Sequence, residues 1–159
     1  VKEGLFSAIQ FEVEGRRALD LFAGSGQLGI EALSRGAKSA VFVDMRRDAC
    51  DIVRENLTKT RLLERAQIVR SDFQTYLKTC RQTFDLVFLD PPYAEKFLEN
   101  AMFLISEIDI LSDSGIIICE HPVEKQLPET FGRLRRERAY HYGRAAVALY
   151  RKSVPESIV

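Results

Sequence analysis

Short hydrophobic runs alternate along the chain with segments whose apolar residues have helical spacing. The runs are Ala18–Phe22, Ala40–Val43, Gln67–Val69, Leu86–Leu89 and Ile116–Cys119. Near-continuous runs of Val, Ile, Leu and Phe are typical of parallel strands buried on both faces. Helical spacing predicts helices near Leu28–Ser34, Arg47–Leu57, Phe73–Cys80 and Glu95–Ile108, after a leading helix at Lys2–Ile9. The alternation predicts an α/β sheet with right-handed crossovers.

The pattern changes after the fifth run. Arg133–Tyr142 and Ala145–Arg151 are joined by a short turn at Gly143 and are expected to form an antiparallel hairpin. The sequence therefore predicts a seven-stranded, mostly parallel, Rossmann-like sheet that ends in this hairpin, with helices on both faces. No repeat or linker interrupts residues 1–159, so a single domain is expected.

Charge and cysteine content narrow the function classes. Lys+Arg and Asp+Glu are both 23, so no global charge indicates a polyanion partner, and no apolar run approaches the roughly 20 residues of a membrane span. The three cysteines are too scattered for a metal site or disulfide framework. Basic and aromatic residues do gather in the predicted hairpin, as a solvated surface or as an edge that contacts phosphates: Arg133, Arg135, Arg136, Arg138, Tyr140, His141, Tyr142 and Arg144.

A glycine-rich loop follows the first predicted strand in the stretch LDLFAGSGQLG. Gly24, Gly26 and Gly29 occupy a G-x-G-x-x-G pattern. Such glycines let a strand turn sharply into a helix and let a ligand approach the backbone. The pattern indicates a nucleotide cofactor site, and a tight turn without a ligand is the alternative.

Three aspartates near this loop indicate which nucleotide it binds. Asp20 would repel a pyrophosphate but suits a ligand with an ammonium group. Asp44 can accept hydrogen bonds from both ribose hydroxyls, or it can cap the following helix. Asp72 can accept a hydrogen bond from an adenine amine, with helix capping again as the alternative. Together they predict a pocket for an adenosine with a cationic tail, the shape of S-adenosylmethionine, whereas NAD leaves Asp20 unexplained.

The segment FDLVFLDPPY places D-P-P-Y directly after the fourth hydrophobic run. Open α/β sheets carry their sites at the carboxyl ends of strands, so Asp90, Pro91, Pro92 and Tyr93 are the predicted catalytic residues. The prolines stiffen the backbone, and the Asp90 carboxylate and Pro91 carbonyl can hold the hydrogens of an exocyclic amine. Tyr93 offers a face for base stacking. This arrangement favours methyl transfer to a nucleobase amine, and a stiff structural loop is the alternative.

These motifs in combination resemble the RsmD family of class I methyltransferases, which methylate guanine N2 in 16S ribosomal RNA. The opening VKEGLFSAI is similar to the family's V-[RK]-E-x-L-F helix, and YGRAAVALYRK is similar to its final hairpin. The resemblance implies S-adenosylmethionine as cofactor, no metal, a ribosomal RNA or small-subunit partner, a monomer and a cytoplasmic location. It implies a cofactor site at Asp20, Phe22, Gly24, Ser25, Gly26, Asp44, Met45, Asp72 and Phe73.

Family members usually carry a basic segment, implicated in RNA contact, before the V-[RK]-E helix, and this sequence starts at that helix. If the natural protein also lacks the segment, RNA contact must rest on the arginine-rich hairpin. His121, in CEHP after the fifth run, is expected to be a structural histidine, because the proposed chemistry leaves no vacancy for a further base.

Three other functions compete with this interpretation. A methyltransferase acting on adenine N6 of DNA, or on another amine such as a glutamine side chain, shares the chemistry, but those relatives more often carry Asn at the position of Asp90. An NAD-dependent oxidoreductase follows from the glycine pattern but lacks a Tyr-x-x-x-Lys pair. A nucleotide-binding module without catalysis is the third.

Overall fold

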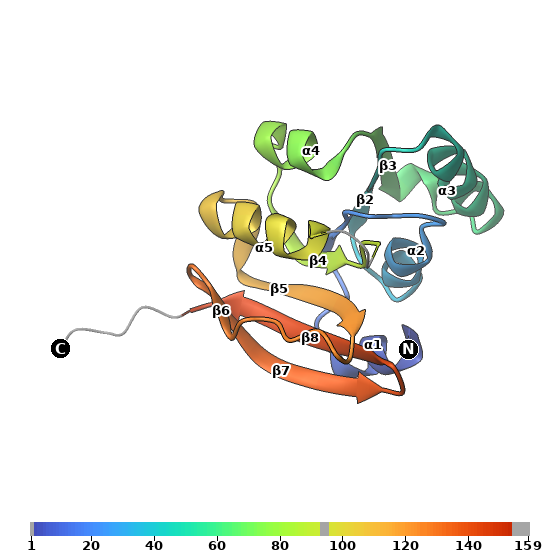
Figure 1. Cartoon of the computed structure of the whole chain (residues 1–159). Coiled ribbons are helices and arrows are strands. Elements are labelled where there is room, and N and C mark those ends of the chain that lie inside the picture. The colour runs from blue at the N-terminus through green and yellow to red at the C-terminus, as the bar shows by residue number, and fades with distance from the viewer. Residues whose placement is uncertain (1, 93–95, 154–159) are drawn as a thin grey trace.

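The computed structural model describes residues 2–92 and 96–153 (Figure 1). Within these residues, eight strands form one sheet in the order β3-β2-β1-β4-β5-β8-β7-β6. The first five strands are mutually parallel: β1 (Arg17–Asp20), β2 (Ser39–Asp44), β3 (Ala66–Arg70), β4 (Phe84–Leu89) and β5 (Leu111–Pro122). The last three pair antiparallel: β6 (Thr130–Phe131), β7 (Leu134–Tyr142) and β8 (Ala145–Lys152).

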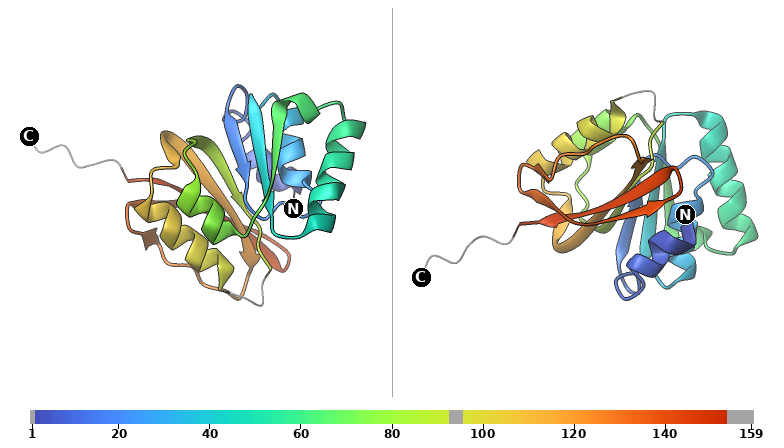
Figure 2. Two further views of the ribbon diagram at one scale, coloured as in Figure 1. Left: turned by 90° about the horizontal axis from the view of Figure 1, so that it is seen from above. Right: turned by 60° about the horizontal axis from the view of Figure 1, so that its bottom comes forward.

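Helices cover both faces of the sheet (Figure 2). Side chains of α1 (Lys2–Ala8), α2 (Gln27–Ser34) and α3 (Arg47–Lys59) share one hydrophobic cluster with Phe88 and Ile118. Those of α4 (Phe73–Thr79) and α5 (Phe97–Glu107) share the other cluster with Leu89 and Cys119. Successive residues of β4 and β5 thus alternate between two buried clusters, which explains the continuous hydrophobic runs. A 3₁₀ turn (Leu63–Arg65) precedes β3.

The predicted α/β class with helices on both faces is confirmed, but the predicted count of seven strands is wrong. The additional strand, β6, has two residues and pairs with the start of β7. Two residues are too few to produce an alternating pattern in a sequence. β5 is also longer than the predicted run Ile116–Cys119. The hydrophobic pattern missed its start because the first residues of the strand include the polar Ser112, Asp113 and Ser114.

Strand order brings several loops to one edge of the sheet. β1 lies between β2 and β4, so the order reverses beside β1, and open α/β sheets bind ligands at the carboxyl ends of the strands at such a point. Pro122 at the end of β5 pairs with Ala145, which places the Gly143 turn at the same edge. None of the described helices is long and apolar enough to cross a membrane.

Candidate active site

A cavity of about 630 Å³ opens at the carboxyl ends of β1 to β4. Most of the residues predicted for the cofactor and catalytic sites line it: Phe22, Gly24, Asp44, Met45, Asp72, Phe73, Asp90, Pro91 and Pro92. Strands far apart in sequence thus deliver the glycine loop, the aspartates and the proline segment to one place. Tyr93 lies outside the described residues.

The glycine loop is held to the second strand by Asp44. One carboxylate oxygen accepts a hydrogen bond from Gly24 N–H at 3.0 Å, and the other accepts one from Arg46 N–H at 2.9 Å. The alternative role of Asp44 as a helix cap is wrong, because Arg46 occupies the N-cap position of α3. Gly24 and Gly26 have φ values of 57° and 82°, which favour glycine in this turn. Ser25 is exposed, and its carbonyl accepts a hydrogen bond from Asn56.

Asp20 lies buried next to the cavity lining, with 2% of its surface exposed. Its carboxylate accepts a hydrogen bond from Gly29 N–H at 3.0 Å, so the third glycine of the loop also serves this aspartate. Burial, together with the negative charges of Asp90 and Asp44, raises the pKa of Asp20 to about 7. A cation close to this side chain would stabilise its ionised form.

Asp72 caps α4. It accepts hydrogen bonds from the backbone N–H and the hydroxyl of Thr75, both at 2.8 Å, and these bonds lower its pKa. The capping alternative is therefore confirmed. Because Asp72 also lines the cavity, the adenine contact stays a prediction.

Aromatic side chains form an apolar wall of the cavity. Phe22 and Phe73 have ring centroids 5.2 Å apart, and Phe97 stacks on Phe22 at 6.2 Å with an interplanar angle of 12°. Met45 lies at the rim with 62% of its surface exposed. Flat and apolar side chains beside Asp44 suit a purine nucleoside. The sequence prediction did not include Phe97, whose position depends on how α5 packs.

The catalytic segment has an acidic neighbour that the sequence prediction did not include. Leu89 pairs with Cys119 in the parallel ladder of β4 and β5, so Asp90 and Glu120 follow on adjacent strands and on the same face. Burial of Asp90 and the adjacent Glu120 carboxyl raise the pKa of Asp90 to about 7. Only strand register makes these two residues neighbours, and register is not visible in the sequence.

His121 has the structural role expected of it. It is buried, and its Nδ1 lies 2.9 Å from the Pro122 carbonyl oxygen, so Nδ1 donates a hydrogen bond. All three cysteines are free; Cys119 is buried, whereas Cys50 and Cys80 are only half-buried. Across residues 2–92 and 96–153, no group of three or more His, Cys, Asp or Glu is placed to hold a metal ion.

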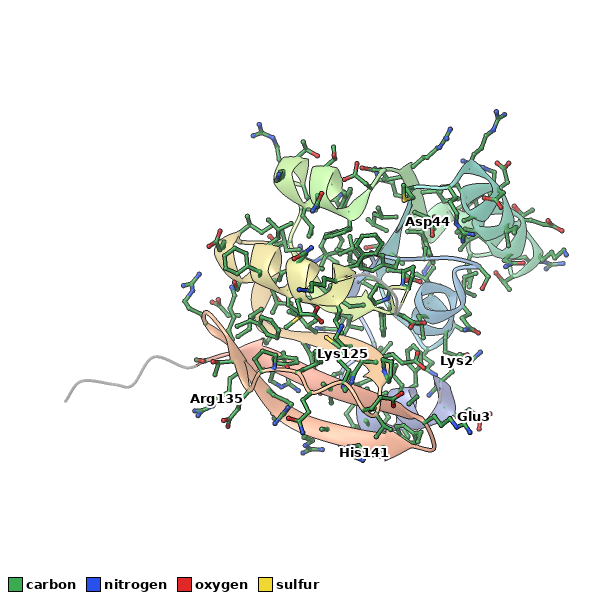
Figure 3. All side chains as sticks on the ribbon, in the orientation of Figure 1. Lys2, Glu3, Asp44, Lys125, Arg135 and His141 are labelled. Atoms are coloured by element: carbon green, nitrogen blue, oxygen red, sulfur yellow. The ribbon has the colours of Figure 1, made fainter. Side chains whose placement is uncertain are left out.

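The basic and aromatic residues predicted to gather in the hairpin are spread along β7 and the turns at its two ends. Arg135 and His141 lie toward opposite ends of β7 (Figure 3). Leu134 pairs with Lys152, far from the site, whereas Tyr142 pairs with Ala145 beside the end of β5. Only the half of the hairpin from Arg138 to Arg144 lies toward the edge that carries Asp90.

The family model described as "Conserved hypothetical protein 95" matches residues 1–151. The chain belongs to this family, the RsmD family. "Putative rRNA methyltransferase YlbH" of Bacillus subtilis is 45% identical over 155 residues, covering 96% of this chain and 84% of that protein. "Ribosomal RNA small subunit methyltransferase D" of Escherichia coli is 33% identical over 152 residues, covering 96% and 76%.

A solved structure described as "Putative methyltransferase yhhF from Escherichia coli" superposes with a TM-score of 0.89. It is 31% identical, and the match covers 96% of this chain and 86% of that one. The fold is therefore that of class I methyltransferases, and the cofactor is S-adenosylmethionine.

Proposed function

We propose that this RsmD-family protein transfers a methyl group from S-adenosylmethionine to N2 of a guanine in small-subunit ribosomal RNA. The observation that carries the proposal is the position of Asp90-Pro91-Pro92, at the carboxyl end of β4 and in the lining of the cofactor cavity. The relatives named as ribosomal RNA methyltransferases support the RNA substrate.

The proposed cofactor contacts follow from the cavity. Asp44 is placed to accept hydrogen bonds from the ribose, with the aromatic wall and Met45 beside the adenine. Asp20 is buried near the glycine loop, where its carboxylate would face the ammonium end. The cofactor supplies an electrophilic methyl group on a sulfonium, and the chain's own residues hold that group toward Asp90.

The exocyclic N2 amine is a weak nucleophile because its lone pair is conjugated with the guanine ring. We propose that the Asp90 carboxylate and the Pro91 carbonyl accept its two hydrogens and so direct the lone pair at the methyl carbon. The new N–C bond forms as the S–C bond breaks, and the electron pair of that bond stays on sulfur. The amine then loses a proton, which the carboxylate of Asp90 can accept.

The test is transfer of a labelled methyl group to small ribosomal subunits that lack the modification, followed by nucleoside analysis. The expected product is N2-methylguanosine; N6-methyladenosine would overturn the guanine assignment. We expect Asp90→Ala to abolish transfer while binding of S-adenosylhomocysteine, measured by calorimetry, is retained. Tight NAD binding with no response to S-adenosylhomocysteine would favour the oxidoreductase instead.

A further inference from the structure

A second groove lies outside the cofactor cavity, between α1 and β7. Its volume is about 560 Å³, and its lining includes Ser7, Phe11, Arg138, Tyr140 and Tyr142. α1 packs on the face of the sheet opposite α4 and α5 (Figure 2). The proposed methyl transfer does not use this groove.

One wall of the groove is a pair of tyrosines on β7. Tyr140 and Tyr142 are stacked, with ring centroids 6.4 Å apart and an interplanar angle of 27°. Gly4 of α1 lies against Tyr142, since a Cβ on Gly4 would be 2.5 Å from the ring carbon Cε1. The close approach of helix and strand thus fixes the position of one ring.

The guanidinium of Arg138 adds a positive charge to the same wall. Arg138 donates a hydrogen bond to the Tyr140 hydroxyl at 3.2 Å, and its Nε lies 3.8 Å from a carboxylate oxygen of Glu137. Both charged side chains are solvent-exposed, and exposed pairs at such a distance contribute little free energy. The guanidinium therefore stays available to an anionic or aromatic ligand.

Phe11 also lines the groove, with 92% of its surface exposed. Single exposed apolar residues are ordinary, but this ring lines the same groove as two stacked tyrosines and an arginine. Aromatic faces beside a cation are what proteins use to bind successive bases of a single strand.

One end of the groove lies at the sheet edge that carries the active site. Tyr142 lies at the edge where β5 ends, because its partner Ala145 also pairs with Pro122. Asp90 directly follows β4, whose carboxyl end lies at the same edge of the sheet as the end of β5. From Arg138 to Tyr142 the strand rises about 13 Å. Stacked nucleotides of one strand rise about 3.4 Å each, so this length spans roughly three to four of them.

We propose that this groove binds a single-stranded segment of the RNA substrate, next to the nucleotide that enters the active site. Bases stack on Phe11 and on the tyrosine pair, and the Arg138 guanidinium contacts the phosphate backbone. The inference rests on the proposed function for the identity of the RNA, but the groove can be tested by binding alone.

The chain contains no tryptophan, so Phe11→Trp introduces a single fluorescent reporter that keeps a stacking ring. We expect single-stranded RNA oligonucleotides to quench this fluorescence at saturation, and Arg138→Ala in the same background to weaken the titration at least about fivefold. Unchanged fluorescence at RNA concentrations that saturate binding would overturn the proposal, whether or not the protein methylates RNA.

Kinetics on small ribosomal subunits give a second test. Phe11→Ala should raise KM at least about fivefold, the low end of one base stack, while kcat, the melting temperature and the affinity for S-adenosylhomocysteine stay unchanged. Phe11→Trp should restore KM. The controls Phe103→Ala on α5 and Arg81→Ala before β4 remove exposed side chains that do not line the groove and should have no effect.

A photoreactive phenylalanine at position 11 separates RNA from protein as the occupant. We expect the cross-link to small subunits to be lost on nuclease digestion. A cross-link to a ribosomal protein, or normal KM in Phe11→Ala, would overturn the proposal. Absence of methyl transfer by the wild-type protein would refute the proposed function instead, leaving the fluorescence result to decide the groove.

Discussion

Asp90 and Glu120 together set the expected pH dependence of transfer. Burial and the neighbouring carboxyl raise the pKa of Asp90 to about 7, so Asp90 is mostly protonated below that pH. A neutral carboxyl is a weaker acceptor for the amine hydrogens than a carboxylate, and it cannot take up the proton that the amine releases. We expect kcat/KM to rise as the pH increases from 6 to 8. Glu120→Gln removes the neighbouring negative charge and should move this rise to lower pH.

The measurement is the pH profile of labelled methyl transfer for the wild type and the variant. Glu64→Gln, an exposed acid in the 3₁₀ turn, serves as the control and should leave the profile unchanged. A profile that moves to higher pH in Glu120→Gln would contradict the proposed interaction of the two carboxyls.

The raised pKa of Asp20 leads to a separate prediction about cofactor binding. Because its pKa is raised to about 7, Asp20 is largely protonated in the free protein below that pH. The cationic end of S-adenosylmethionine favours the carboxylate, so binding should release a proton and tighten as the pH increases through 7. Calorimetry at pH 6.5 in two buffers of different ionisation enthalpy measures the released proton.

Asp20→Asn is the matched variant, since its amide oxygen can still accept the hydrogen bond from Gly29 N–H. We expect this variant to bind the cofactor more weakly and without proton release. Equal proton release in both proteins would assign the proton to another group, and Asp90 is the nearest candidate.

Asp72 is both a predicted cofactor ligand and the N-cap of α4, so it should also stabilise that helix. Asp72→Ala removes both hydrogen bonds to Thr75 and should lower the free energy of unfolding measurably, seen as a lower urea midpoint. Asp72→Asn keeps an acceptor for the backbone N–H of Thr75, so its free energy of unfolding should fall only slightly. Urea denaturation measures the stability of both Asp72 variants. Asp51→Ala, which removes an exposed carboxylate from α3, is the control. If Asp72→Ala were as stable as Asp72→Asn and the Asp51→Ala control, the capping role of Asp72 would be contradicted.

Elements with a strong local pattern were predictable from the sequence. β4 and β5 are buried on both faces, so their hydrophobic runs indicated strands, and the proline segment followed one of them directly. β6 was not predictable, because two residues carry no periodicity. The hairpin arginines are close in sequence, but a strand rises about 3.3 Å per residue, which separates Arg135 from Arg144.

Site residues that belong to a sequence motif were predictable. Site residues that only strand register or helix packing brings to the cavity were not. The glycine loop and Asp90 stand in recognisable patterns, and the structure places them around one cavity. Glu120 and Phe97 reach the site through the register of β4 with β5 and the packing of α5. Neither relationship leaves a trace in the local sequence.

At the scale of the whole molecule, Arg151 connects the C-terminal hairpin to the segment after α1. Its Nη2 lies 2.6 and 2.7 Å from the two carboxylate oxygens of Glu12, and its Nε donates to Glu137 of β7. The arginine and Glu12 side chains are less than a third exposed, so solvent screens this pair less than an open surface pair. Arg151 therefore holds together the two elements that form the α1–β7 groove.

Arg151→Met keeps most of the apolar stem but removes both ionic contacts, and Lys152→Met is the matched control on the same strand. Lys152 pairs only at 3.3 and 3.5 Å with the exposed Asp109 and Asp113, so its loss should matter little. We expect Arg151→Met to lower the free energy of unfolding by about 1–2 kcal/mol and to speed hydrogen exchange in β7 and β8. Its KM for small subunits should rise while the affinity for S-adenosylhomocysteine stays unchanged, because the cofactor cavity is built by β1 to β4. Equal loss of cofactor and subunit binding would instead indicate that the hairpin and the cofactor half of the sheet unfold together.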